Sequence, residues 1–222
     1  MAPMARIDIV TFDCYGTLID WRRGITAAFA NAGVSTDGDA VLEAYGEIEQ
    51  KVEAERYRPY RDVLRETAVR IAREFGLGLS TDDAAFLPDS LPSWQPFPDT
   101  NASLERLRDA GIRLGILSNV DDDLLAATRR HFTVDFDVII TAQQVGSYKP
   151  AHGHFLAARQ RIGDAHWLHA AQSDFHDIVP ANALAIENAW INRLGEPALP
   201  GGTPTHEFRD LATFADWATS AG

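Results

Sequence analysis

The sequence predicts an α/β protein, in which a parallel β-sheet carries helices on both faces and a helical segment is inserted near the start of the chain. Three observations predict this class. Several short apolar runs have the length and the β-branched content of buried parallel strands. Amphipathic segments of helical length separate the later runs, as in a sheet built from strand–helix–strand units. A long interval after the first run contains helical segments and no convincing strand.

Strand and helix segments alternate along most of the chain. The predicted strands are Ile7–Phe12, Arg113–Ser118, Val138–Thr141, Trp167–Ala170 and Ala189–Asn192. The predicted helices that alternate with them are Asn101–Ala110, Asp121–His131, His152–Ile162 and Asp177–Ala185, and a last helix lies around Leu211–Thr219. This order indicates a Rossmann-like parallel sheet.

The interval after Asp20 interrupts the alternation with a run of helices. They are predicted over Trp21–Ala32, Thr36–Arg56, Tyr60–Phe75 and Thr81–Leu91. Gly33 and Gly76 stand where helix C-termini favour a left-handed residue. We therefore expect an α/β core domain formed by residues 1–19 and 97–222, and an inserted helical cap domain at residues 20–96.

Composition and charge exclude several partner classes. The net charge of −12 argues against broad attraction to nucleic acids or anionic membranes. No apolar run approaches the roughly 20 residues that cross a bilayer, so we expect no membrane partner. Cys14 is the single cysteine, which excludes an intrachain disulfide. The first residues carry no apolar signal segment, and we expect a cytoplasmic protein.

Polar side chains follow four of the predicted strands. Asp13 and Thr17 come after the first, Ser118–Asn119 ends the second, Lys149 follows the third and Asp177 follows the fourth. In an open parallel sheet, ligands bind beyond the carboxyl ends of the strands. A carboxylate, hydroxyls, an amide and an ammonium at one edge can supply a nucleophile and its charge balance.

These residues resemble the four sequence motifs of the haloacid dehalogenase superfamily. Phe12–Leu18 (FDCYGTL) is similar to the first motif, Ser118–Asn119 to the second, Lys149–Pro150 to the third and the stretch through Asp177 to the fourth. They occur in the order of the family, with the helical insertion in the place of one of its cap types. The resemblance implies an aspartate nucleophile at Asp13.

Two positions depart from the magnesium-dependent phosphatases of this superfamily. Tyr15 stands in place of their general-acid aspartate, and Ala171–Gln172 replaces a Gly-Asp pair that helps to hold the metal. A neutral amide is a weaker magnesium ligand than a carboxylate, and tyrosine is a poor acid near neutrality. Both features are similar to the L-2-haloacid dehalogenase branch, so we expect no metal and no cofactor.

That branch implies hydrolysis of a small 2-haloalkanoic acid, a carboxylate substrate, to the 2-hydroxy acid. Asp13 displaces the halide, Lys149 balances the negative charge and keeps the pKa of Asp13 low, and Asp177 activates the water that opens the ester. The residues expected to bind substrate are Tyr15, Thr17, Ser118, Asn119, Lys51 as the nearest match to a cap arginine, and Asp174.

Other functions remain open from the sequence alone. One is a phosphatase with an altered site. Another is a hydrolase of a different activated bond alpha to a carboxylate, such as that of a small cyclic imino acid. A third, from a different class, is a catalytically idle protein that binds a ligand or a protein through its cap. Related dehalogenases also imply a homodimer.

Overall fold

The computed structural model describes residues 6–220, which form two compact units. The core unit comprises the chain up to Ile19, Pro96–Asn119 and the chain from His131 onward. The helical unit comprises Asp20–Gln95 together with Val120–Arg130. The structure thus groups residues 120–130 with the helical unit, whereas the sequence prediction includes them in the core domain.

Six parallel strands build the core unit, in the spatial order β3-β2-β1-β4-β5-β6. They are β1 (Ile9–Phe12), β2 (Arg113–Ser118), β3 (Val138–Thr141), β4 (Trp167–Ala171), β5 (Glu187–Ile191) and β6 (His206–Phe208). The first five confirm the predicted strands. β6 was missed, because this segment of three residues, His-Glu-Phe, is too short to show a strand pattern and pairs with β5 alone. The predicted fold class is confirmed.

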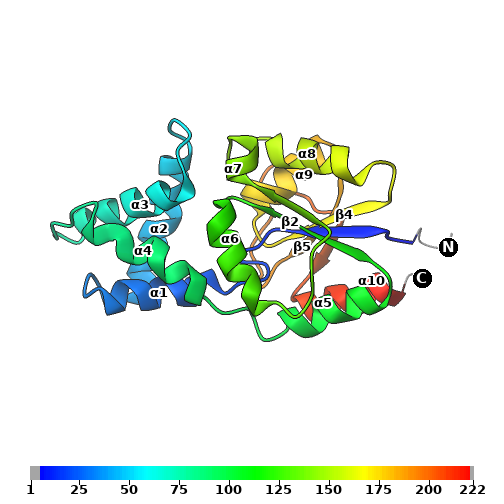
Figure 1. Ribbon diagram of the computed structural model, residues 1–222, viewed down its shortest axis with the longest axis horizontal. Helices are drawn as coiled ribbons and strands as arrows, with labels where there is room; N and C mark the ends of the chain where they lie inside the picture. Colours follow the sequence, from blue (N-terminus) through cyan, green and yellow to red (C-terminus); the bar gives the residue numbers. More distant parts are fainter. Residues whose placement is uncertain (1–5, 221–222) are drawn as a thin grey trace. The chain divides into compact units, whose positions relative to one another are not determined.

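Helices cover both faces of this sheet (Figure 1). Figure 1 shows α5 (Thr100–Asp109) and α10 (Leu211–Ser220) on one side, and α8 (Gly153–Ile162) and α9 (Val179–Ala183) on the other. Buried apolar side chains fill the space between the sheet and the helices α8 and α9, among them Ile9, Leu117, Phe155 and Ala181. A short α7 (Ala142–Val145) follows β3 and ends at a left-handed Gly146.

The helical unit consists of short amphipathic helices. They are α1 (Trp21–Asn31), α2 (Gly38–Glu53), α3 (Tyr60–Glu74), α4 (Phe86–Ser90) and α6 (Asp122–Thr128). The aspartates Asp20 and Asp37 cap α1 and α2 by accepting a hydrogen bond from the third residue on. The Asp121 carboxylate accepts from two backbone N–H groups at the start of α3, at 2.9 Å each.

Gly33 and Gly76 both have the predicted positive φ, at 69° and 75°. Among residues 6–220, no helix has the length and apolar character that a membrane crossing requires.

Candidate active site

The nucleophile candidate Asp13 lies directly after β1, at the start of a tight turn. Gly16 has φ 107°, a value that a side chain would disfavour, and its N–H donates to the Ile19 carbonyl. This turn brings Thr17 back over Asp13, where its hydroxyl donates to Oδ2 at 3.2 Å. The N–H of Gln172 donates to the same hydroxyl at 2.8 Å, so Thr17 is fixed as a donor to Asp13.

Lys149 connects the two carboxylates at the carboxyl ends of the strands. Its Nζ lies 2.9 Å from Asp13 Oδ1 and 2.7 Å from Asp177 Oδ1, and it donates to the Leu117 carbonyl at 2.9 Å. The side chains of Lys149 and Asp177 are 1% and 0% exposed, whereas that of Asp13 is 11% exposed. Of these three groups, Asp13 is therefore the one that a ligand can reach.

The two carboxylates that share the Lys149 ammonium have pKa values shifted in opposite directions. Burial opposes ionisation of Asp177, but Lys149 and a hydrogen bond from His169 lower its pKa to about 2. Burial raises the pKa of Asp13, and the charge of Asp177 raises it further, while Lys149 acts in the opposite direction. Burial alone would lower the pKa of Lys149, but the two carboxylates raise it. The expectation that Lys149 keeps the pKa of Asp13 low is wrong, because burial and the nearby charge of Asp177 together raise that pKa by more than Lys149 lowers it.

Asn119 holds the backbone of the lysine. Its side-chain amide donates to the Lys149 carbonyl at 3.0 Å and accepts from the Lys149 N–H at 2.7 Å. These two hydrogen bonds fix the backbone of Lys149 and thereby the direction of its side chain. The predicted contact of Asn119 with substrate or with Asp13 is not among these hydrogen bonds and stays a prediction.

Ser118 ends β2 with a buried hydroxyl. Its Oγ has no hydrogen-bond partner within the described part of the chain. The Ser118 carbonyl accepts from Nε2 of the buried His154 at 3.1 Å. Burial, and next the charge of Lys149, lower the pKa of His154 to about 3, so this imidazole is neutral near pH 7. A buried hydroxyl left without a partner is a site for a polar group of a ligand.

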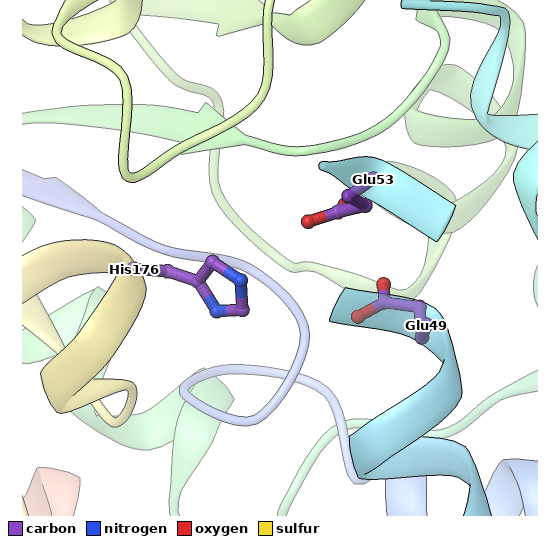
Figure 2. Close-up of side chains that lie close together, drawn as sticks. All are labelled: Glu49, Glu53 and His176. Carbon is purple, nitrogen blue, oxygen red and sulfur yellow. The ribbon is translucent and has the colours of Figure 1, made fainter. Parts of the chain in front are cut away.

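Asp177 lies on a single π-helical turn, Asp174–Ile178, which follows β4. Ser173 caps this turn by accepting from the N–H of His176, a residue that Figure 2 shows on the same turn. Asp177 Oδ1 accepts from Lys149 and from His169, whereas Oδ2 is buried without a partner among residues 6–220. Oδ2 can therefore accept a hydrogen bond from a water molecule bound inside the core unit.

Comparison with known proteins agrees with this arrangement. Residues 7–189 match the family model of the haloacid dehalogenase-like hydrolases. The chain belongs to this family.

Individual relatives of this haloacid dehalogenase-like hydrolase align over nearly its whole length. Two (S)-2-haloacid dehalogenases of Pseudomonas putida are 28% identical over 235 residues and 29% identical over 227 residues. These alignments cover 96% and 98% of this chain and 99% of each relative. A solved L-2-haloacid dehalogenase from Xanthobacter autotrophicus, with chloropropionic acid covalently bound, is similar in fold with a TM-score of 0.82 at 20% identity, covering 95% of this chain and 97% of the other.

Two of the predicted substrate-binding residues have contacts of another kind in this hydrolase. Asp174 is buried, and its Oδ2 accepts from the N–H of Leu199 in the loop after β5. A Cβ atom at Gly202 would overlap the Asp174 carboxylate, so the same loop packs closely on it. These contacts favour a loop-anchoring role for Asp174. Tyr15 is half-buried on the turn after β1, where it bridges to Ile19.

Lys51 belongs to the helical unit, near the C-terminus of α2. Its side chain is 68% exposed, and its Nζ lies 3.3 Å from the Glu47 carboxylate one turn earlier. Figure 2 shows two further carboxylates of this helix, Glu49 and Glu53, on successive turns. Glu49 accepts from the hydroxyl of Tyr60 at 3.0 Å. The substrate-binding role of Lys51 stays a prediction.

Sequence reasoning missed Thr11 and His169, which lie behind Asp177. Both are polar residues inside strands whose other members are almost all apolar, β1 and β4. That interruption is the one signal in the sequence. The pairing of β1 with β4 places Thr11 opposite His169, and this register was not predictable from either strand alone.

Proposed function

We propose that this chain hydrolyses the carbon–halogen bond of a small 2-haloalkanoic acid through a covalent ester of Asp13, without a metal ion. The observation that carries the proposal is the Asp13–Lys149–Asp177 cluster, in which the partly exposed Asp13 is the carboxylate that a ligand can reach. The (S)-2-haloacid dehalogenases that align over nearly the whole chain support the substrate class.

In the first step, an Asp13 oxygen attacks C2 of the substrate and the carbon–halogen bond breaks. The electron pair of that bond leaves with the halide, which needs no proton, so no general acid is required. The raised pKa of Asp13 makes its carboxylate a better nucleophile than an ordinary aspartate once it is ionised. In this proposal the Ser118 hydroxyl, which has no partner within residues 6–220, donates to the substrate carboxylate.

In the second step, water attacks the acyl carbon of the Asp13 ester. Asp177 Oδ2 accepts a hydrogen bond from that water and orients it. One water proton goes to the product hydroxyl and the other is released, because Asp177, with a pKa of about 2, does not retain it. The product is the 2-hydroxy acid with inverted configuration at C2, and Asp13 keeps one solvent oxygen.

The residues around Asp13 do not fit the magnesium ion of the related phosphatases. Magnesium prefers several hard oxygen ligands, chiefly carboxylates. Gln172 offers a neutral amide in the fourth motif, and Asp177 Oδ1 is already bound by an ammonium and an imidazole. No step of the proposed reaction uses a metal.

A halide-release screen tests the substrate and the metal together. The substrates are chloro-, bromo- and fluoroacetate and both enantiomers of 2-chloropropionate, each with EDTA and with added magnesium. Phosphate esters and azetidine-2-carboxylate serve as the competing classes. We expect halide release that EDTA does not reduce. Phosphate release that depends on magnesium would instead identify a phosphatase.

Oxygen labelling tests the ester. In a single turnover in H₂¹⁸O with enzyme in excess, the product hydroxyl is expected to be mostly unlabelled, and ¹⁸O is expected in a peptide that contains Asp13. A labelled product with no label on Asp13 would mean that water attacks the substrate directly.

We also propose a homodimer, which the resemblance to the dehalogenase branch implies, and a cytoplasmic location. The buried free thiol of Cys14 suits a reducing compartment. Sedimentation velocity at micromolar concentration tests the first proposal, and cell fractionation tests the second.

A further inference from the structure

Three consecutive hydrogen bonds connect Trp167, Thr11, His169 and Asp177. The indole N–H of Trp167 donates to the Thr11 hydroxyl at 2.7 Å, and Thr11 Oγ1 lies 2.8 Å from His169 Nδ1. On the other side of the ring, His169 Nε2 lies 2.9 Å from Asp177 Oδ1. Thr11, His169 and Asp177 are all fully buried, so no solvent competes for these bonds.

The two ends of this series of hydrogen bonds fix its direction. The Trp167 indole is a donor only, and the ionised Asp177 carboxylate is an acceptor only. His169 must therefore carry its proton on Nε2 to reach Asp177. Thr11 accepts from the indole and donates its own proton to His169 Nδ1. Thr11 can donate to Nδ1 only where that nitrogen carries no proton, so the pattern corresponds to the Nε2–H tautomer of His169.

Neighbouring groups keep the imidazole and the carboxylate in place. The ring of Phe155 meets His169 edge-on, with centroids 5.1 Å apart and an interplanar angle of 84°. Lys149 and His169 both bind Oδ1 of Asp177, from different strands and loops of the core unit. With Oδ1 doubly bound, Oδ2 is the oxygen left for a water molecule.

We propose that His169 is a positioning residue for the hydrolysis of the Asp13 ester, and that Trp167 and Thr11 set its tautomer. This inference rests on the proposed function. His169 does not touch the substrate. It holds Asp177 so that Oδ2 can orient the attacking water, whereas the first step, which needs Asp13 and Lys149, is little affected by its loss.

Two matched pairs of variants test this role. His169→Gln retains an amide N–H near the place of Nε2, whereas His169→Leu removes the donor. Thr11→Ser retains the hydroxyl, whereas Thr11→Val removes it at nearly constant volume. Circular dichroism and thermal melting show whether each variant is folded, and Asp177→Asn serves as the reference for a lost hydrolysis step.

Rapid-mixing experiments with 2-chloropropionate separate the two steps. For His169→Leu we expect a halide burst within about threefold of the parent and ester hydrolysis slowed about 10- to 100-fold, the range for a misplaced reacting group. Both kcat and KM then fall together, and mass spectrometry detects the acyl adduct on Asp13. His169→Gln and Thr11→Ser are expected to recover most of the rate. Equal slowing of both steps, or identical behaviour of the Gln and Leu variants, would overturn the proposal.

A second measurement does not depend on the substrate. The ¹⁵N shifts of His169 are expected to report the Nε2–H tautomer, and to change in Thr11→Val but not in Thr11→Ser. An Nδ1–H tautomer in the parent would overturn the inference even if dehalogenation is confirmed. If the protein shows the expected tautomer but releases no halide, the hydrogen bonds behind Asp177 are as inferred, and it is the proposed function that is refuted.

Discussion

Replacing Lys149 by methionine is expected to destabilise the core unit strongly, and more at alkaline than at acidic pH. The variant keeps most of the length of the side chain but removes an ammonium that binds Asp13, Asp177 and the Leu117 carbonyl at 2.7–2.9 Å. The side chain is 1% exposed, so water does not replace the lost contacts. Removal of one partner from a buried ion pair costs about 3–5 kcal/mol.

The sign of the pH dependence follows from the carboxylates that remain. Without the ammonium, burial and mutual repulsion raise the folded-state pKa of both Asp13 and Asp177 above the unfolded value. When the pKa of a carboxyl group is higher in the folded than in the unfolded state, the folded state is favoured at low pH, where the group is protonated. This advantage is lost as the pH rises through the folded-state pKa. Each tenfold change in proton affinity corresponds to about 1.4 kcal/mol. The deficit relative to the parent should therefore be larger at pH 8 than at pH 5.

Urea denaturation at pH 5, 6.5 and 8 measures both effects. Lys51→Met is the matched control, because this lysine is exposed and pairs with Glu47 along its own helix, and we expect a change within about 0.5 kcal/mol. Adding Asp177→Asn to Lys149→Met removes one uncompensated charge and should restore part of the loss. A loss below about 1 kcal/mol, or the same loss at all three pH values, would refute the charge-balance reasoning.

Two further predictions concern the nucleophile. Asp13→Asn should abolish turnover while the melting temperature stays near that of the parent; unfolding, or retention of most activity, would contradict the assignment. Because burial raises the pKa of Asp13, the acid limb of kcat/KM should lie above the ordinary aspartate value of about 3.9. A limb at or below that value in the pH profile, with Asp177 already ionised, would argue against Asp13 as the group that titrates.

The carboxyl ends of the strands were predictable because chemistry and topology agree there. Asp13, Ser118 and Lys149 each follow an apolar run, and parallel strands bring such residues to one edge. The partners of these residues were not predictable. Asn119 pairs with the Lys149 backbone across 30 positions, and Thr11 reaches His169 across 158 positions. Such contacts depend on strand register, which neither segment encodes by itself.

The helix prediction was also wrong in a segment where a proline interrupts the helical pattern. The predicted helix Thr81–Leu91 is in fact a 3-10 turn at Asp83–Ala85, followed by α4 and by a second 3-10 turn at Leu91–Ser93. Pro88 lies within this stretch and lacks the N–H that a continuous helix needs. The start of α2 at Gly38 rather than Thr36 has a similarly local cause, because Asp37 caps it.

The Ser118 hydroxyl allows a test in which stability and function move in opposite directions. Its Oγ is buried and has no partner in the described part of the protein, so Ser118→Ala removes a desolvated polar group and should stabilise the fold by about 1 kcal/mol. The same hydroxyl is proposed to bind the substrate carboxylate, a bond to a charged group whose loss should raise KM about tenfold or more. Ser103→Ala is the matched control: this buried serine donates to the Asp99 carbonyl at 2.6 Å, so its variant should lose about 1 kcal/mol and keep its KM. If Ser118→Ala is destabilised like Ser103→Ala and its KM is unchanged, the hydroxyl serves the fold, and the substrate carboxylate is bound elsewhere.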